Sequence, residues 1–189
     1  MSTILKITGS NQGRERNKHD FYPTPDYATE ALLECEKFTN VWEPACGDGA
    51  ISKVLIRNKI KTISTDLVDY GYGDGSGRDF LFERELLAPD IITNPPFSLA
   101  LEFAQKAIEL GVEKLALLVR LQFLEGVKRG EFFKQFPPKH VYVFSKRLSF
   151  NVSGEFQSGG VMAFAWFVFE QGKHRETRKY QWFSRVSWI

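Results

Sequence analysis

The feature of this sequence that most constrains its fold is an alternation of short apolar segments with segments whose apolar residues recur at helical spacing. Strand-like segments cover 39–45, 61–67, 89–93, 114–124, 140–144 and 162–169, and helix-like segments cover 25–37, 98–111, 126–136 and a stretch that starts at Ile51. Strands that alternate with helices form a mostly parallel sheet with helices on both faces. The last two strands have no helix between them, so we expect them to be antiparallel neighbours at one edge of the sheet.

The composition fits a globular protein with a hydrophobic core. The hydrophobic fraction of 43 % argues against intrinsic disorder, and two cysteines are too few for a disulfide scaffold. No window approaches the roughly 20 apolar residues that a membrane span needs, and residues 1–13 do not resemble a signal peptide. We therefore expect a cytoplasmic protein with no membrane partner, in which Cys35 and Cys46 are reduced thiols.

The charge is distributed unevenly along the chain. Residues 1–19 carry a net charge of +3 and residues 173–189 carry +4, so the rest of the chain is acidic. We expect a basic flexible arm at 1–19, a single domain at 20–172 and a basic tail at 173–189. Basic ends of this kind can bind a polyanion such as a nucleic acid, although charged termini can also be merely solvated.

Two features at the ends of predicted strands indicate a ligand site. The segment Glu43–Gly49 reads EPACGDG, and its glycines let the backbone approach a ligand closely before the next helix begins. It is not the dinucleotide fingerprint, because Ser52 stands where the third glycine belongs. Asp66 ends the next strand, where a carboxylate can accept hydrogen bonds from ribose hydroxyls. Each feature alone is equally consistent with an ordinary turn.

The most specific feature is the sequence Asn94-Pro95-Pro96-Phe97 at the end of a third strand. The two prolines stiffen the backbone and remove two N–H donors. The polar groups that remain are acceptors, namely the Asn94 side-chain oxygen and the Pro95 carbonyl. Phe97 adds an aromatic face beside them. Paired acceptors next to an aromatic ring suit a planar amino group such as the exocyclic NH₂ of a nucleobase.

In its order of motifs, the chain resembles the S-adenosylmethionine-dependent adenine-N6 DNA methyltransferases, in particular the small phage- and prophage-encoded type. The motifs that carry this resemblance are Phe21-Tyr22-Pro23-Thr24-Pro25, EPACGDG at 43–49, Thr65-Asp66-Leu67, Arg78-Asp79-Phe80, Asn94-Pro95-Pro96-Phe97 and, in the second half, Phe132-Phe133, Arg147–Phe150 and Ala165–Val168. The resemblance implies an α/β fold of the class I, Rossmann-like methyltransferases. That fold has a mostly parallel seven-stranded sheet, helices on both faces and an antiparallel edge strand.

The resemblance also implies roles for individual residues. The methionine end of S-adenosylmethionine would be surrounded by Tyr22, Thr24, Glu43, Ala45 and Gly47, and Asp66 would hold the ribose hydroxyls. The cofactor would also be bound by the neighbouring Cys46, Asp48 and Gly49. Asp79 would accept from the cofactor adenine, with Phe80 against its ring. Asn94, Pro95 and Pro96 would hold the target amino group, and Phe97 would stack on the target base. Independently of the resemblance, the residue types predict that Thr24 caps the first helix and that Pro25 is its first residue.

We therefore expect a methyltransferase that acts on adenine N6, with nucleic acid, most simply DNA, as its partner. The alternatives are methylation of an RNA base, of cytosine N4 or of a protein glutamine, and an inactive module that binds only cofactor or nucleic acid. No metal is expected, because His19, His140 and His174 lack ligand spacing. The oligomeric state cannot be read from the sequence.

Little chain is left over for recognising a target sequence. Only residues 98–189 follow Phe97, and most of them are needed to complete the sheet and its helices. The largest spare segment is 145–160, which contains Lys146 and Arg147. We therefore expect weak sequence specificity or a preference for exposed bases, and methylation confined to one strict short motif in random DNA would contradict this.

Overall fold

The structure is a computed structural model, and it describes residues 22–150, 162–170 and 186–189. The expected arm at 1–19 and most of the expected tail and of segment 145–160 lie outside these residues. The main elements are α1 (Asp26–Cys35), β1 (Asn40–Glu43), α2 (Ala50–Arg57), β2 (Lys61–Ser64), β3 (Asp90–Thr93), α3 (Ala100–Glu109), β4 (Lys114–Arg120), α4 (Val127–Gln135), β5 (His140–Val143), β6 (Phe164–Glu170) and β7 (Val186–Trp188). Single-turn 3₁₀ helices lie at Phe80–Phe82, Phe97–Leu99 and Leu121–Leu124. No helix in these three ranges is long and apolar enough to cross a bilayer.

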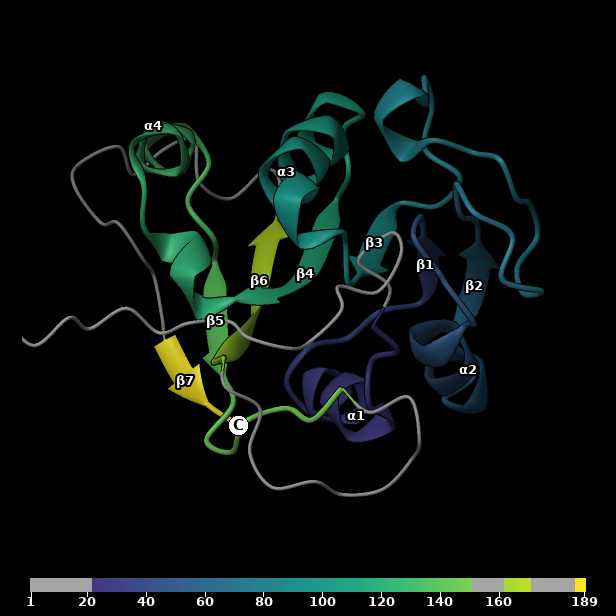
Figure 1. Cartoon of the computed structure of the whole chain (residues 1–189), viewed down its shortest axis with the longest axis horizontal. Helices are drawn as coiled ribbons and strands as arrows, with labels where there is room; N and C mark the ends of the chain where they lie inside the picture. The colour runs from purple at the N-terminus through teal and green to yellow at the C-terminus, as the bar shows by residue number, and fades with distance from the viewer. Residues whose placement is uncertain (1–21, 151–161, 171–185) are drawn as a thin grey trace, which may run out of the picture.

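The strands form one seven-stranded sheet in the order β2-β1-β3-β4-β6-β5-β7 (Figure 1). β2, β1, β3 and β4 are mutually parallel, and β6 pairs antiparallel with β4 on one side and with β5 on the other. The expected mostly parallel sheet and the antiparallel pairing of the last two predicted strands are confirmed. β6 itself lies inside the sheet, because β7 pairs parallel with the far side of β5 and forms the edge. This strand from the tail was not expected from the sequence.

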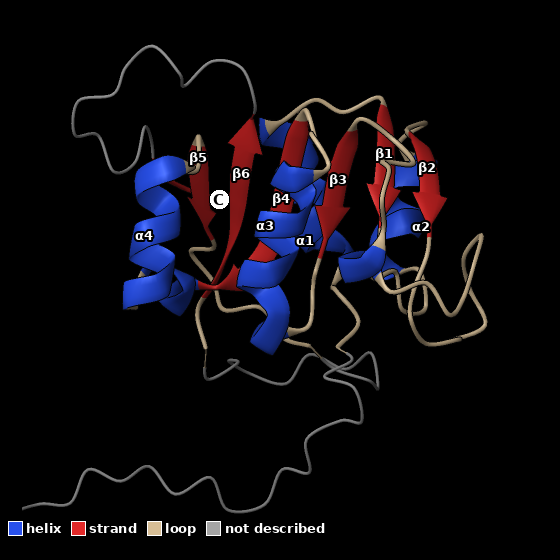
Figure 2. Cartoon of the chain, turned by 90° about the horizontal axis from the view of Figure 1, so that it is seen from above, coloured by secondary structure: helices blue, strands red, loops and turns tan. Residues whose placement is uncertain are grey.

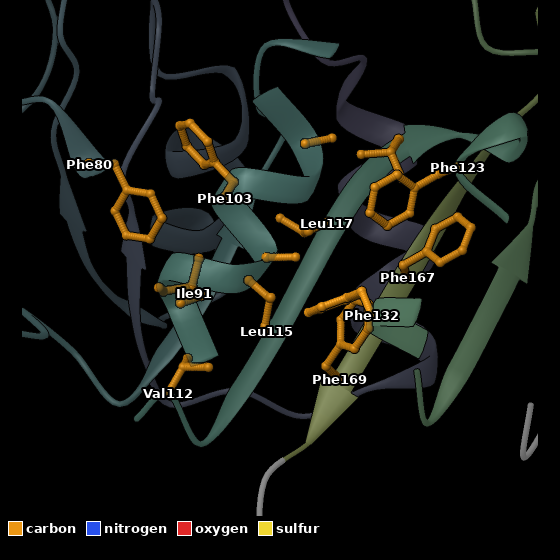
Figure 3. Close-up of a cluster of buried hydrophobic side chains, with 14 of the residues drawn as sticks. Phe80, Ile91, Phe103, Val112, Leu115, Leu117, Phe123, Phe132, Phe167 and Phe169 are labelled. Atoms are coloured by element: carbon orange, nitrogen blue, oxygen red, sulfur yellow. The ribbon is translucent and has the colours of Figure 1, made fainter. Parts of the chain in front are cut away.

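Helices cover both faces of the sheet, as predicted. α3 and α4 lie on one face, and α1 and α2 lie on the other (Figures 1 and 2). Successive strand residues point to opposite faces, so the sheet has a core on each side. Leu115 and Leu117 of β4 pack towards α3 and α4, in the core shown in Figure 3, whereas Ala116 and Leu118 pack with residues of α1 and α2.

Several element boundaries differ from the sequence prediction by one to four residues; β2, for example, ends at Ser64 rather than at residue 67. β4 ends at Arg120, and residues 121–124, predicted as the end of that strand, form a 3₁₀ turn. Thr24 does not cap α1: the residue before the helix is Pro25, and no side chain caps the first turn. The physical reason is that the Thr24 hydroxyl accepts a hydrogen bond from the Asn94 side chain, at 3.1 Å, and so serves the end of β3 instead.

A cluster of polar side chains stabilises the side of the sheet at which the parallel strands begin, that is, their amino-terminal ends. Glu36, just after α1, is buried and accepts hydrogen bonds from Lys114 Nζ at 2.8 Å and from Tyr142 Oη at 2.9 Å. These bonds lower the pKa of Glu36 although burial alone would raise it. The cluster ties α1 to β4 and β5, and it lies at the edge opposite to the carboxyl ends of β1, β2 and β3.

Asp90 lies at the same edge, and burial raises its pKa to about 6 from an ordinary 3.8. Between these two values the unfolded chain has released a proton that the folded protein keeps, so ionisation of Asp90 makes folding less favourable as the pH rises. The Asp90→Asn variant cannot ionise. We expect its melting temperature to exceed that of the wild type by a margin that grows from pH 4 to pH 6 and is then constant.

Thermal melts at half-unit pH steps measure this margin, and Glu85→Gln, a change at an exposed loop carboxylate, is the control. A margin that stays the same across the pH range would show that Asp90 does not titrate in this window.

Candidate active site

A cavity of about 460 Å³ opens at the carboxyl ends of β1, β2 and β3. Its position follows from the topology. The chain runs from β1 outwards to β2 and then returns to the other side of β1 to form β3. The loops after β1 and β3 therefore diverge, and such a switch point in an open α/β sheet is where ligands bind. The strand arrows of β1, β2 and β3 all point towards this edge (Figure 2).

Ten of the fifteen residues predicted for the site line this cavity. They are Tyr22, Thr24, Glu43, Ala45, Cys46, Gly47, Asp48, Asp66, Asn94 and Pro96. They come from the segment before α1, the turn after β1 and the ends of β2 and β3, which lie far apart in the sequence. The sequence interpretation thus grouped side chains that the fold brings together.

Asp66 fixes the turn after β1. Its Oδ2 accepts a hydrogen bond from Gly47 N at 2.8 Å, and its Oδ1 accepts one from Val68 N at 2.8 Å. The carboxylate is 9 % exposed. Because each carboxylate oxygen has two lone pairs, Asp66 can still accept from a ligand in the cavity. It therefore both holds the backbone of the glycine turn and presents negative charge to the cavity.

Glu43 is a second carboxylate in the cavity wall, and it is 1 % exposed. The Ser52 hydroxyl donates to its Oε2, and the Ser52 and Ser64 hydroxyl oxygens are 2.6 Å apart. Burial raises the pKa of Glu43 well above its ordinary value, with the nearby Asp66 and Asp48 adding to the effect. A cationic ligand would favour the ionised form. Ser52 stands where the dinucleotide fingerprint has its third glycine. Its structural role here is to donate a hydrogen bond to the buried Glu43 carboxyl group.

Cys46 is not positioned as a nucleophile. Its side chain is buried, and burial together with Glu43 and Asp66 raises the pKa of the thiol to about 12. Thiolate is the reactive form, so at neutral pH Cys46 is an inert part of the wall.

The Asn94 side chain has one oriented donor and one unused acceptor. Its Nδ2 donates to Thr24 Oγ1 at 3.1 Å and to the Tyr22 carbonyl at 3.3 Å. The carbonyl can only accept, which fixes the orientation of the amide. Its Oδ1 is buried and has no hydrogen-bond partner within the described part of the chain. A buried acceptor of this kind requires a partner or an explanation, and Oδ1 is the atom that the sequence predicts to receive an amino group.

Phe97 is in an environment that the sequence did not predict. It does not line the cavity, and its ring stacks on Tyr22 with centroids 5.7 Å apart and packs against Phe164 at 5.5 Å. The Arg120 guanidinium carbon lies 4.5 Å from the centre of the same ring. A target base could stack on Phe97 only where one of these side chains moves.

Four further predicted residues are outside the cavity lining. Phe80 is 3 % exposed and packs between Trp42 and Phe103 in the core, so its ring does not face a ligand. Asp79 accepts from Leu81 N at 3.0 Å and caps a 3₁₀ turn. Pro95 is buried behind the lining, and Gly49 has its own constraint, described below. Phe80 is thus a core residue that does not line the cavity, and its predicted contact with the cofactor adenine stays a prediction.

Several lining residues were missed. Leu67, Val68 and Tyr70 follow Asp66, and Ile51, Ser98 and Leu99 begin the helical segments after the turn and after β3. A signal existed for the first group, because apolar residues directly after a strand-terminal acid are well placed to contact the same ligand. Arg120 does not line the cavity, but the sequence interpretation also missed its place beside Phe97, at the end of a strand with five apolar residues before it.

The position of Gly49 has no room for a side chain, because the Tyr72 ring lies close to its backbone. Its φ is +82°, and a Cβ there would lie 2.4 Å from the Tyr72 ring, which packs across the turn. We expect Gly49→Ala to be destabilising through both this overlap and the left-handed backbone. Removing the ring in the double variant Gly49→Ala/Tyr72→Ala relieves only the overlap.

Denaturant unfolding of the two single variants and the double variant measures the coupling. The Gly49→Ala penalty should be smaller by about 0.5–3 kcal/mol in the Tyr72→Ala background, as for other residues in direct contact. Equal penalties in both backgrounds would show that the ring moves aside freely.

No protein-family model matches the sequence, and no curated protein matches it. Among solved structures, a candidate RNA methyltransferase from Pyrococcus horikoshii is similar with a TM-score of 0.62 at 15 % identity, over 84 % of this chain and 92 % of that one. A dimethyladenosine transferase from Plasmodium falciparum gives 0.56 at 14 % identity, over 79 % and 62 %. The modification subunit of a candidate type I restriction enzyme from Vibrio vulnificus gives 0.54 at 12 % identity, over 79 % and 44 %.

This chain therefore spans less than two thirds of the length of the latter two proteins. At these identities the similarity concerns the fold. The mixed seven-stranded sheet with helices on both faces is the class I, Rossmann-like fold of these methyltransferases.

Proposed function

We propose that this protein transfers a methyl group from S-adenosylmethionine to an exocyclic amino group, namely N6 of adenine in DNA. The observation that carries the proposal is the Asn94 amide. Asn94 lines the cavity, its Nδ2 is held by Thr24 and the Tyr22 carbonyl, and its buried Oδ1 has no hydrogen-bond partner among the described residues.

The cavity suits the cofactor. S-adenosylmethionine carries a cationic sulfonium and an ammonium group, and Glu43, Asp48 and Asp66 supply three carboxylates in the lining. The apolar side chains of Leu67 and Val68 adjoin Asp66, which suits a nucleoside whose ribose meets the acid. A volume of about 460 Å³ lies within the range of small-molecule sites, roughly 300–1,000 Å³.

Asn94 and the Pro95 carbonyl would act on the target amine. An amine attached to an aromatic ring is a weak nucleophile, because its lone pair is delocalised into the ring. Two acceptors that bind its hydrogens favour a tetrahedral nitrogen and localise that lone pair. The fixed Asn94 amide makes this arrangement in advance, so the site needs little reorganisation during the reaction.

When bound, the cofactor supplies an electrophilic methyl carbon on sulfur. The amine lone pair would form the new N–C bond, the electrons of the S–C bond would stay with the departing sulfur, and one amino proton would be released to solvent. Asn94 holds the nitrogen in line for this displacement. The site therefore acts through position and hydrogen bonding, and Cys46 has no part as a nucleophile.

Methylation of an RNA base is the second candidate. The name of one similar structure, a candidate RNA methyltransferase, favours it. Tritium transfer from labelled cofactor to DNA, RNA and protein separates the substrate classes. Mass spectrometry of DNA from expressing and non-expressing cells then distinguishes N6-methyladenine from N4-methylcytosine, and label that appears only in RNA or protein would overturn the assignment to DNA.

Replacing Asn94 by alanine should abolish the reaction while leaving cofactor binding intact. The expected loss of rate is roughly 10²–10³-fold, by comparison with the removal of one fixed hydrogen-bonding group elsewhere. Single-turnover transfer and calorimetric cofactor binding measure the two effects. Asn58→Ala, at an exposed position after α2, is the matched control. Undiminished transfer by Asn94→Ala would refute the assignment.

Replacing Asp66 by asparagine should weaken cofactor binding instead. The change removes the charge but keeps an oxygen that can accept from Gly47 N. Hydrogen bonds to charged groups contribute about 1.5–3 kcal/mol, so we expect the Kd to rise roughly 10- to 100-fold. Asp69→Asn, an exposed neighbour outside the cavity, should have no effect on the Kd. An unchanged Kd for Asp66→Asn would exclude a direct contact with the cofactor.

A further inference from the structure

Arg120 is a cation next to Phe97, the residue on which the target base is proposed to stack, and no acidic side chain among the described residues forms an ion pair with it. It ends β4, whose five preceding residues are buried and apolar. Its guanidinium lies over the Phe97 ring, and its Nε is buried without a hydrogen-bond partner among the described residues. No carboxylate in the described ranges forms a salt bridge with it. A guanidinium in this state is available to bind an anion.

At the carboxyl ends of the parallel strands, the charge of the side chains changes from negative to positive on passing from β1 and β2 across β3 to β4. On the β1 and β2 side, the cavity is lined by Glu43, Asp48 and Asp66. The cations nearby are engaged: Lys53 donates to the Asp48 carbonyl at 2.7 Å, and Arg78 pairs with Glu83 at 2.7 Å. The Asn94–Phe97 segment follows β3, which lies between this acidic side and β4.

The other side of the edge is basic. β5 is parallel to β4, because both are antiparallel to β6, so the residues after β5 emerge at the same edge as Arg120. Lys146 and Arg147 follow β5 and are exposed. The chain then returns to the target side, where Phe150 packs against Phe164 at 4.7 Å. A cationic cofactor would thus bind on the acidic side, and an anionic substrate would bind on the basic side.

We propose that Arg120 binds a backbone phosphate next to the target nucleotide, so that the substrate of this site is a polynucleotide. The inference rests on the proposed function and adds to it a residue that binds the backbone of the polynucleotide substrate. The planar fork of guanidinium donors matches phosphate oxygens, whereas a glutamine side chain or a free base offers no such anion. Because Arg120 lies over Phe97, movement towards a phosphate would also uncover that ring for the target base.

The test is the salt dependence of binding to a fluorescently labelled single-stranded 12-mer, measured by anisotropy with S-adenosylhomocysteine present. Each phosphate contact on a single strand contributes about 0.7 to the slope of log K against log salt. We expect Arg120→Gln to lower the slope by about this amount. The wild-type advantage in affinity should then shrink about 2.5-fold between 50 and 200 mM salt.

Two further variants separate this role from a structural one. Arg120→Lys keeps a charge that can contact phosphate, so it should retain the wild-type slope. Lys61→Gln removes one exposed charge at the opposite edge of the sheet and should also retain it. Melting temperatures and the Kd for S-adenosylhomocysteine check that all the variants are folded.

The inference is overturned if Arg120→Gln keeps the wild-type slope, if Arg120→Lys loses it as Arg120→Gln does, or if the wild type does not bind the oligonucleotide. Methyl transfer is assayed separately on the same 12-mer and on its RNA counterpart. A wild-type protein that binds with the expected slope but transfers no methyl group to either would refute the proposed function and leave the phosphate contact standing.

Discussion

The candidate site depends on one topological constraint, the return of the chain across β1 after β2 to form β3. Parallel strands must end at a common edge, and this crossover leaves a gap between the loops that follow β1 and β3. The segments that carry Glu43, Asp66 and Asn94 meet around that gap. A carboxylate-to-backbone hydrogen bond from Gly47 to Asp66 then joins the first two strand ends. The site is thus a product of strand order more than of any single motif.

Much of the fold could be predicted because apolar periodicity reports directly on burial. The alternation of faces in β4 is the clearest case: its residues divide between two cores, so the strand is a continuous apolar run. Turn chemistry was also informative, since Gly47 and Gly49 both have positive φ. β7 left no such signal, because the burial of an edge strand is weak and its three residues are exposed.

The sequence predicted which residues line the cavity where position along a strand decides their placement, and it failed to do so where side-chain packing decides it. Asn94 and Asp66 line the cavity because a strand end leaves them few alternatives. Phe80 was assigned to a ligand although its ring is in the core, because the sequence cannot tell which side of a turn an aromatic ring will occupy. The prediction that Thr24 caps α1 was wrong for a similar reason. Its hydroxyl could accept a hydrogen bond either from the first turn of the helix or from a distant side chain, and in the structure it accepts from Asn94, 70 residues away.

That long-range bond has a consequence for how the arrangement around Asn94 is lost on heating. The segment that orients the Asn94 amide precedes a helix whose first turn has no side-chain cap. Helix ends and the chain next to them open at lower cost than a sheet interior does. Partial detachment there would release the amide while both cores stay packed. Loss of the oriented amide and global denaturation should therefore be separate events, and the first should be governed by opening of the few residues before α1.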